Sequence, residues 1–218
     1  MFIGHYGVAF GAKSVSLAVP LWVYFIAVQW LDVVWSILVL LGVEKLHIVR
    51  GFTEANPYDL YYMPYTHGLP GAVALSVTFG AVVAALVANR RGTAFLTVTA
   101  AAFSHWLLDL IVHVPDMPLY DNTDKVGFGL WRHVAISFPL ELAVLLAGTW
   151  YYARCLPPAG RRGHIALRAF VVVMVLLQIY ANFGPPPSSE TMMAIMALTL
   201  YIALAAIAAW VERARTPQ

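Results

Sequence analysis

Windows of about 20 mostly apolar residues recur along this chain, and an α-helix needs that length to cross the hydrocarbon core of a bilayer. Six windows meet the requirement, at about 19–43, 68–89, 93–114, 130–153, 165–183 and 191–211. Only 11% of the residues are charged, against about 25% in an average soluble domain. A soluble fold of this size could not bury so much apolar surface in one core. The pattern therefore predicts an all-α fold, a polytopic transmembrane helical bundle that contacts the lipid bilayer and forms a single integral membrane domain over residues 1–218.

A seventh helical element is expected before the first window. Residues 2–17 are apolar enough for a helix, and Pro20 suits the first turn of the next one. We therefore expect 2–17 and 20–43 to form a hairpin, with Lys13 and Ser14 near its turn. The alternative is an N-terminal extension without fixed structure.

Lysine and arginine are distributed unevenly between the loops. The connections after the second, fourth and sixth windows are basic and carry Arg90, Arg91, Arg154, Arg161, Arg162, Arg213 and Arg215. The stretches 44–67, 115–129 and 184–190 are mixed, acidic or without basic residues. The positive-inside rule places the basic ends in the cytoplasm and the other loops on the outer, periplasmic-type side of a plasma membrane. The tyrosines of 58–65 then suit an interfacial aromatic belt.

Charge and cysteine content exclude several classes of protein. The net charge is only +2, so nothing indicates a nucleic-acid partner. Cys155 is the single cysteine, which excludes an internal disulfide and a Cys-rich zinc module. The first 13 residues lack a basic region and a recognisable cleavage site, so no secretory signal peptide is expected.

Several ionisable residues lie inside the predicted spans, where each costs about 2.5 kcal/mol or more at the bilayer centre and therefore suggests a function. They are Asp32, His105, Asp109, His113 and Glu141. His105, Asp109 and His113 are spaced i, i+4 and i+8, so they share one face of a helix. Two imidazoles and a carboxylate in that pattern could bind a divalent metal. One straight helix usually supplies two neighbouring ligands, so the third residue would orient a ligand or face the substrate.

Depth within the membrane links these groups across separate elements. At about 1.5 Å of rise per residue, His5, Asp32, His105 and Glu141 all lie about 18–20 Å from the nearest basic end. His67 opens its helix and would have to point inward to join them. Structural roles are the alternatives: Asp32 as a hydrogen-bonded buried carboxylate, His67 as an interfacial cap, and Glu141 as a tie between helices. Because His5, Asp32, His67, His105 and Asp109 all need partners at a similar depth, we expect a metal centre.

Four segments resemble a known family. They are IGHYGVAFG near the start, the apolar helix with Asp32, PYTHGLPGA before the second window and FSHWLLDLIVH in the third. The chain is similar over about residues 1–145 to the YdjM-like family of bacterial inner-membrane proteins, which are described as metal-dependent hydrolases. The resemblance implies that His5, Asp32, His67, His105 and Asp109 are metal ligands, and it does not extend to the two C-terminal spans within 165–211. The Pro-Asp-x-Asp setting typical of the family's early aspartate is replaced here by Trp30-Leu31-Asp32-Val33-Val34.

The functional expectation combines these observations. Imidazole and carboxylate ligands suit zinc first, with manganese or iron as alternatives. A metal-activated water would hydrolyse a phosphoester or ester of a lipid-like or amphipathic substrate, in a bacterial inner membrane with the site towards the periplasm. His113 is the expected proton shuttle, and Ser104 or Thr66 a hydrogen-bond donor to the substrate. An ion, proton or metal transporter and a non-catalytic membrane scaffold are the alternatives.

Overall fold

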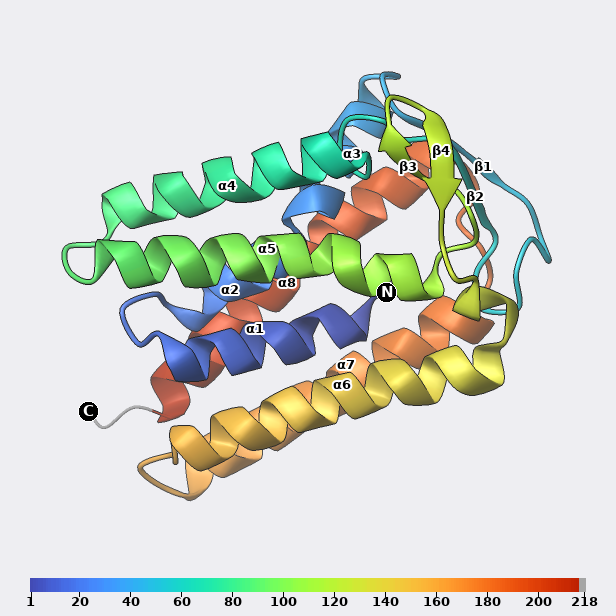
Figure 1. Cartoon of the computed structure of the whole chain (residues 1–218). Helices are drawn as coiled ribbons and strands as arrows, with labels where there is room; N and C mark the ends of the chain where they lie inside the picture. Colours follow the sequence, from blue (N-terminus) through green and yellow to red (C-terminus); the bar gives the residue numbers. More distant parts are fainter. Residues whose placement is uncertain (216–218) are drawn as a thin grey trace.

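The apolar windows form the long helices of a bundle in the computed structural model, which describes residues 1–215 (Figure 1). Five helices of this range are long and apolar enough to cross a bilayer. They are α4 (Leu69–Leu86), α5 (Arg91–Val112), α6 (Val134–Cys155), α7 (Arg161–Phe183) and α8 (Glu190–Arg215). The protein is thus a multi-pass membrane protein of the helical-bundle type, as the sequence predicts.

The first window is broken rather than continuous, which corrects the expectation of one straight span over 19–43. It forms α2 (Leu21–Val28) and α3 (Trp30–Leu40), bent by 56° at Gln29. The carbonyl oxygen of Val28, the last residue of α2, accepts a hydrogen bond from His105 on α5. A side chain that inserts into the helical hydrogen-bond ladder is a known cause of such bends. With the bent pair counted as one span, the described chain has up to six crossings.

The N-terminal element is a buried helix, α1 (Ile3–Val15), that forms a hairpin with α2. Figure 1 shows α1 enclosed between α5 and α6. Glycines let α1 approach α6 closely. A Cβ atom at Gly7 would overlap the Val144 backbone, and one at Gly148 would overlap the Gly7 backbone. Lys13 lies near the hairpin turn, as expected, and its ammonium group is 2.7 Å from the carboxylate of Glu212 on α8.

Two small antiparallel hairpins, which the sequence did not reveal, occupy one end of the bundle. The first pairs β1 (Lys45–Ile48) with β2 (Tyr58–Tyr62), and the second pairs β3 (Met117–Tyr120) with β4 (Thr123–Val126). The 3₁₀ helix η1 (Leu130–Arg132) follows. Ala55 joins these loops to the helices, because its carbonyl accepts from Asn182 of α7 and its N–H donates to the Trp131 carbonyl. We call this the hairpin end.

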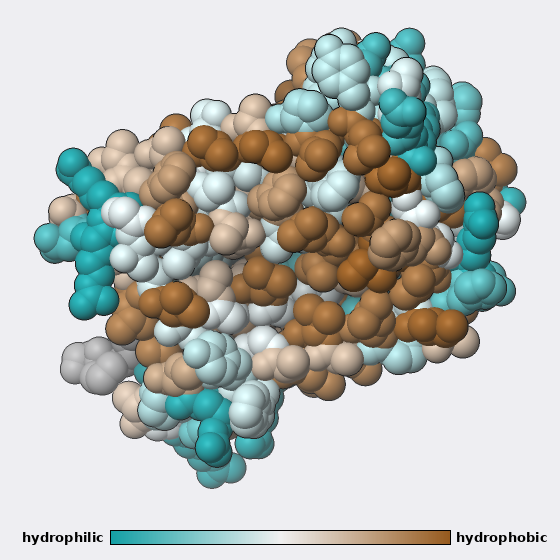
Figure 2. Space-filling model, viewed as in Figure 1, coloured by the Kyte–Doolittle hydropathy of each residue, from teal (hydrophilic) through white to brown (hydrophobic). Residues whose placement is uncertain are grey.

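The opposite end carries the basic connections, and we call it the basic end. The turns α4–α5 and α6–α7 lie there together, on the left of Figure 1. Figure 2 shows hydrophilic side chains gathered at both ends of the visible face and a hydrophobic band between them. A band of this kind is what lipid chains contact in a membrane protein.

Candidate metal centre

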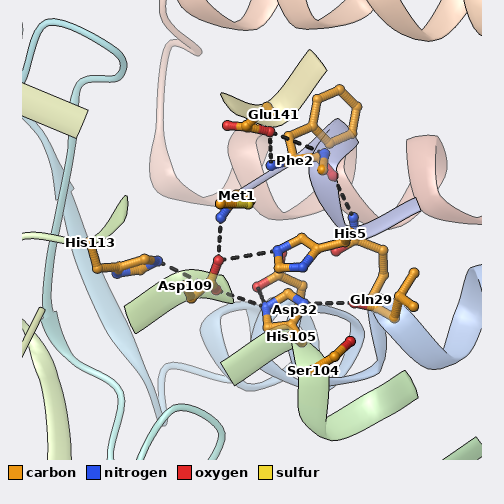
Figure 3. Close-up of polar contacts among 12 residues, drawn as sticks. Met1, Phe2, His5, Gln29, Asp32, Ser104, His105, Asp109, His113 and Glu141 are labelled. Atoms are coloured by element: carbon orange, nitrogen blue, oxygen red, sulfur yellow. Dashed lines mark hydrogen bonds and ion pairs between the residues drawn. The ribbon is translucent and has the colours of Figure 1, made fainter. Parts of the chain in front are cut away.

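Helix α5 positions the first part of the site. His105 and Asp109 are one turn apart on its buried face, and His113 follows at its C-terminal cap. The distance from Nε2 of His105 to Oδ2 of Asp109 is 2.9 Å, and that from Nε2 of His113 to the same oxygen is 3.5 Å. The i, i+4, i+8 spacing therefore does bring the three side chains together (Figure 3).

Three further elements contribute to the same cluster. Nε2 of His5, from α1, is 3.1 Å from Oδ1 of Asp109. Nε2 of His67, just before α4, lies 3.4 Å from Oδ1 of Asp32 on α3 and 3.7 Å from Oδ2 of Asp109. The structure thus brings together all five side chains that the sequence singled out as metal ligands, and His113 joins them. We call these six residues the His/Asp cluster: His5, Asp32, His67, His105, Asp109 and His113.

Three side chains of the cluster lie close enough to ligate one ion, because one ring nitrogen each of His67 and His105 and a carboxylate oxygen of Asp32 are within 4.8 Å of one another. Zinc–nitrogen and zinc–oxygen bonds of about 2.0–2.2 Å place neighbouring tetrahedral ligands about 3.3 Å apart. The separations of the Nε2 atoms of His67 and His105 from the two carboxylates range from 2.9 to 3.7 Å. A buried His/Asp group that could hold a metal ion is therefore present. Its two triads, His5–His105–Asp109 and Asp32–His67–His105, share His105 and so belong to one centre.

Nδ1 of His105 lies 2.7 Å from the Val28 carbonyl oxygen. Because a carbonyl only accepts hydrogen bonds, Nδ1 carries a proton, and Nε2 is the ring atom that faces the carboxylates of the cluster. A backbone carbonyl on the distal nitrogen is a common way to orient a metal-binding histidine.

His67 is oriented through a short relay from a buried carboxylate. The Thr66 hydroxyl donates to Oε2 of Glu44 at 2.6 Å, so its oxygen accepts from Nδ1 of His67 at 2.8 Å. Glu44 is held in turn by the backbone N–H groups of Tyr65 and Thr66. Nε2 of His67 is thereby left free to face Asp32 and Asp109.

His113 is the third histidine whose Nδ1 is held by a neighbouring oxygen atom. Its Nδ1 is 2.8 Å from Oδ1 of Asp116, and its ring packs against Trp131 at a centroid distance of 4.1 Å. The carboxylate orients the ring, so Nε2 of His113 faces Asp109.

Contacts with neighbouring helices and with the N-terminus hold the side chains of Asp32, His5 and Asp109. The Tyr201 hydroxyl of α8 donates to Oδ2 of Asp32 at 2.8 Å, which leaves Oδ1 for the cluster. The rings of His5 and His105 stack with centroids 4.0 Å apart. The amino nitrogen of Met1 also contacts Oδ1 of Asp109 (Figure 3).

Glu141 of α6 ties helices together rather than binding within the cluster. Its Oε2 accepts from the N–H groups of Phe2 at 2.7 Å and Gly4 at 3.3 Å, and Gln178 Oε1 accepts from that of Ile3 at 3.2 Å. These are the orphan donors at the start of α1, which water cannot satisfy inside the membrane. The carboxylate thus anchors the helix that carries His5.

The electrostatics of the cluster fit a cation. Among the described residues, Nε2 of His105 has no hydrogen-bond partner although the side chain is fully buried. This nitrogen faces carboxylate oxygens of Asp109 and Asp32 at 2.9 and 3.4 Å. A buried nitrogen this close to two carboxylates needs a positive charge, carried by a proton on the ring or by a cation between the atoms. A divalent ion supplies that charge, and the donor set of imidazole and carboxylate suits one.

A cavity of about 910 Å³ leads from the cluster towards the hairpin end. Asp32, His67, Asp109 and His113 form part of its wall, and Trp35, Tyr58, Leu177 and Leu200 are among its other lining residues. Burial, together with the neighbouring Tyr180, raises the pKa of the Tyr58 phenol, which therefore stays a neutral hydrogen-bond donor. A substrate group could reach the cluster through this cavity.

Two residues expected to assist catalysis are placed differently from the expectation. Ser104 donates its hydroxyl hydrogen bond to Ala101 at 2.7 Å, within α5. The Thr66 hydroxyl lies between Glu44 and His67, so it positions a ligand. Sequence reasoning missed Glu44 and Tyr201. A glutamate that follows an apolar span was the available signal for Glu44, whereas a tyrosine within an apolar helix gave none for Tyr201.

Comparisons with protein-family models, with curated proteins and with solved structures each gave no match. The resemblance to the YdjM-like family therefore stays a prediction, as does the role of the cluster as a ligand set.

Proposed function

We propose that this protein is a membrane-embedded metal-dependent hydrolase that cleaves a phosphoester or ester bond of a lipid-like substrate. The observation that carries the proposal is the convergence of three histidines, each with its Nδ1 engaged, on two carboxylates at the wall of a cavity. Zinc is the proposed metal, because it accepts such ligands in tetrahedral or five-coordinate geometry.

Either of two triads that share His105 would hold the ion. One is Asp32, His67 and His105, and the other is His5, His105 and Asp109. A cation bound there would polarise a substrate oxygen and lower the pKa of a bound water towards about 7. Because the cavity reaches Asp32, His67 and Asp109, a water or substrate oxygen can approach from that side.

His113 is the proposed proton shuttle. It faces the cavity, and Asp116 stabilises its ring in the protonated and the neutral form. In phosphoester hydrolysis the water oxygen forms a bond to phosphorus, and the bond from phosphorus to the ester oxygen breaks. Nε2 of His113 accepts the proton of the water and returns it to the departing alkoxide, which leaves as an alcohol.

Aromatic side chains fill the core between the cluster and the basic end, which favours hydrolysis over transport. Phe25 packs against Tyr6, Phe10 and Phe170 with ring centroids 4.7–5.6 Å apart. An ion that crossed the membrane through the cluster would have to pass this layer, whereas polar groups line known intramembrane ion paths. A cavity that leads from the cluster towards the hairpin end suits a substrate taken from that leaflet.

The positive-inside rule gives the proposed orientation. The basic end would lie in the cytoplasm of a bacterial cell and the cluster in the outer, periplasmic half of the plasma membrane.

The proposal is tested with detergent-purified protein, zinc and bis(p-nitrophenyl) phosphate or p-nitrophenyl butyrate. We expect release of p-nitrophenol by the wild type, none by His105→Ala, and wild-type rates for His164→Ala, whose side chain is exposed near the basic end. Equal rates for wild type and His105→Ala would contradict the proposal. So would zinc uptake into proteoliposomes by a wild type that hydrolyses neither ester.

A further inference from the structure

The cavity beside the His/Asp cluster extends along two membrane-spanning helices. On α7 its wall includes Leu177 and Ala181, and on α8 it runs from Met193 to Ala203. That stretch of α8 spans eleven residues, or about 15 Å of helix from the first to the last. The hydrocarbon core of a bilayer is about 30 Å thick, so the cavity reaches about as deep as one leaflet.

Part of this wall lies on the lipid-facing surface. Tyr180, Ile195 and Met196 line the cavity and are 53%, 47% and 43% exposed. Ala181 and Ala203 also line it and are exposed. A cavity whose walls continue onto the membrane surface is open sideways to lipid. We call the part between α7 and α8 the slot.

The other part of the cavity is polar and lies at the hairpin end. Arg50, Thr53, Glu54 and Asn56 line it there. Among the described lining residues, Arg50 is the one with a positively charged side chain. Its guanidinium group makes no hydrogen bond or ion pair with another described residue. Glu54 is engaged, because its carboxylate accepts from the Val134 N–H at 2.9 Å. Arginine binds phosphate oxygens well, because its planar donors match their geometry.

The cluster lies between these two parts. Asp109 is three residues and His105 seven residues from the C-terminal end of α5, which is about 5 and 10 Å of helix. This depth below the hairpin end is that of the region where lipid headgroups join their hydrocarbon chains.

We infer that the cavity binds an intact membrane phospholipid with an anionic headgroup, one acyl chain lying in the slot, the headgroup near Arg50 and the linkage region against the His/Asp cluster. This inference rests on the proposed function for its catalytic meaning, because it names the substrate class of the same site. The lipid-binding geometry itself requires no turnover and can be tested separately.

The experiment uses wild-type protein in phosphatidylcholine nanodiscs that contain phosphatidylglycerol with a diazirine in one acyl chain. After irradiation, labelled peptides are mapped by mass spectrometry, with and without prior removal of metal by a chelator. We expect labels on the slot-lining parts of α7 and α8 in both cases. Ala203→Trp, which fills the inner end of the slot, should lower this labelling about tenfold, as expected when roughly two chain methylenes lose their contacts.

Ala206→Trp is the matched control, since Ala206 is exposed on the same helix but does not line the cavity. It should label as the wild type does. If Ala203→Trp does not fold, Ala181→Trp replaces it, because Ala181 lines the slot on α7 and a tryptophan there should lower the labelling as well. Equal labelling of the folded slot variants and the control would overturn the inference.

The headgroup part is tested with Arg50→Gln and with a diazirine-bearing diacylglycerol, which lacks phosphate. We expect the wild type to prefer phosphatidylglycerol, and Arg50→Gln to lose that preference while Arg90→Gln at the basic end keeps it. Equal labelling by both lipids in the wild type would overturn this part. Correct labelling by a protein that hydrolyses no ester would instead refute the proposed function and leave the binding inference standing.

Discussion

The hydroxyl oxygen of Thr66 lies 2.8 Å from Nδ1 of His67, while its hydrogen points to the buried carboxylate of Glu44. This contact orients the ring of His67, because it engages Nδ1 and leaves Nε2 to face Asp32. The side chains that orient the cluster are therefore as much part of the candidate metal centre as the ligands themselves.

Thr66→Val should weaken zinc binding about 10–100-fold, because it removes the acceptor of the His67 N–H and the hydroxyl that donates to Oε2 of Glu44. Thr66→Ser keeps the hydroxyl and should bind as the wild type does. Competition with a chromogenic chelator measures both affinities. An unchanged affinity in Thr66→Val would show that the relay does not orient a ligand.

His113→Asn should keep the metal but lower the rate of ester hydrolysis about 100-fold or more, the usual contribution of a positioned acid–base group. Metal content and turnover are measured on the same preparation. His133→Asn, an exposed histidine at the start of α6, serves as the control. Loss of metal together with activity would make His113 a ligand instead of a proton shuttle.

Much of the cluster was predictable from the sequence, because intramembrane charges are rare and their depth follows from the helical rise. His105 and Asp109 share a face by spacing alone, and His5 and Asp32 reach the same level from separate elements. The common depth of these residues therefore follows from distances along the chain, whereas the inward position of His67 does not.

The contacts that orient the side chains of the cluster were not predictable in the same way. The bend at Gln29, which offers the Val28 carbonyl to His105, has no proline or glycine to signal it. Glu44 and Tyr201 reach the cluster only through the packing of a loop and of α8. Both are tertiary contacts between residues far apart in the chain, which periodicity does not encode. The hairpins β1–β2 and β3–β4 were missed because their strands are short and irregular in pattern.

Gly148→Ala should destabilise the protein by about 1–3 kcal/mol, the usual cost of overpacking, because the new methyl group would overlap the backbone of Gly7. Since α1 carries His5, zinc affinity should fall as well. Gly11→Ala, which meets no atom within 4 Å, should keep the stability or raise it by up to about 1 kcal/mol through its higher helix propensity. Unfolding in detergent micelles measures both variants, and equal stabilities would contradict the close contact of α1 with α6.

Removal of metal should lower the thermal midpoint of the wild type. At a free zinc concentration of about 100 times Kd, binding stabilises the folded state by about 2.7 kcal/mol, or about 5–10 °C for a chain of this size. Thermal unfolding before and after a chelator, and again after zinc is restored, measures the effect. His105→Ala should show no such shift, and the same shift in that variant would place the zinc elsewhere.

Elemental analysis of detergent-purified protein expressed with zinc tests the central claim most directly. We predict about one zinc ion per chain in the wild type and in His47→Ala, whose ring is exposed and paired with Asp59. His105→Ala and Asp109→Ala should each contain almost none. Full stoichiometric metal in both of these variants, or none in the wild type, would contradict a metal centre at the His/Asp cluster.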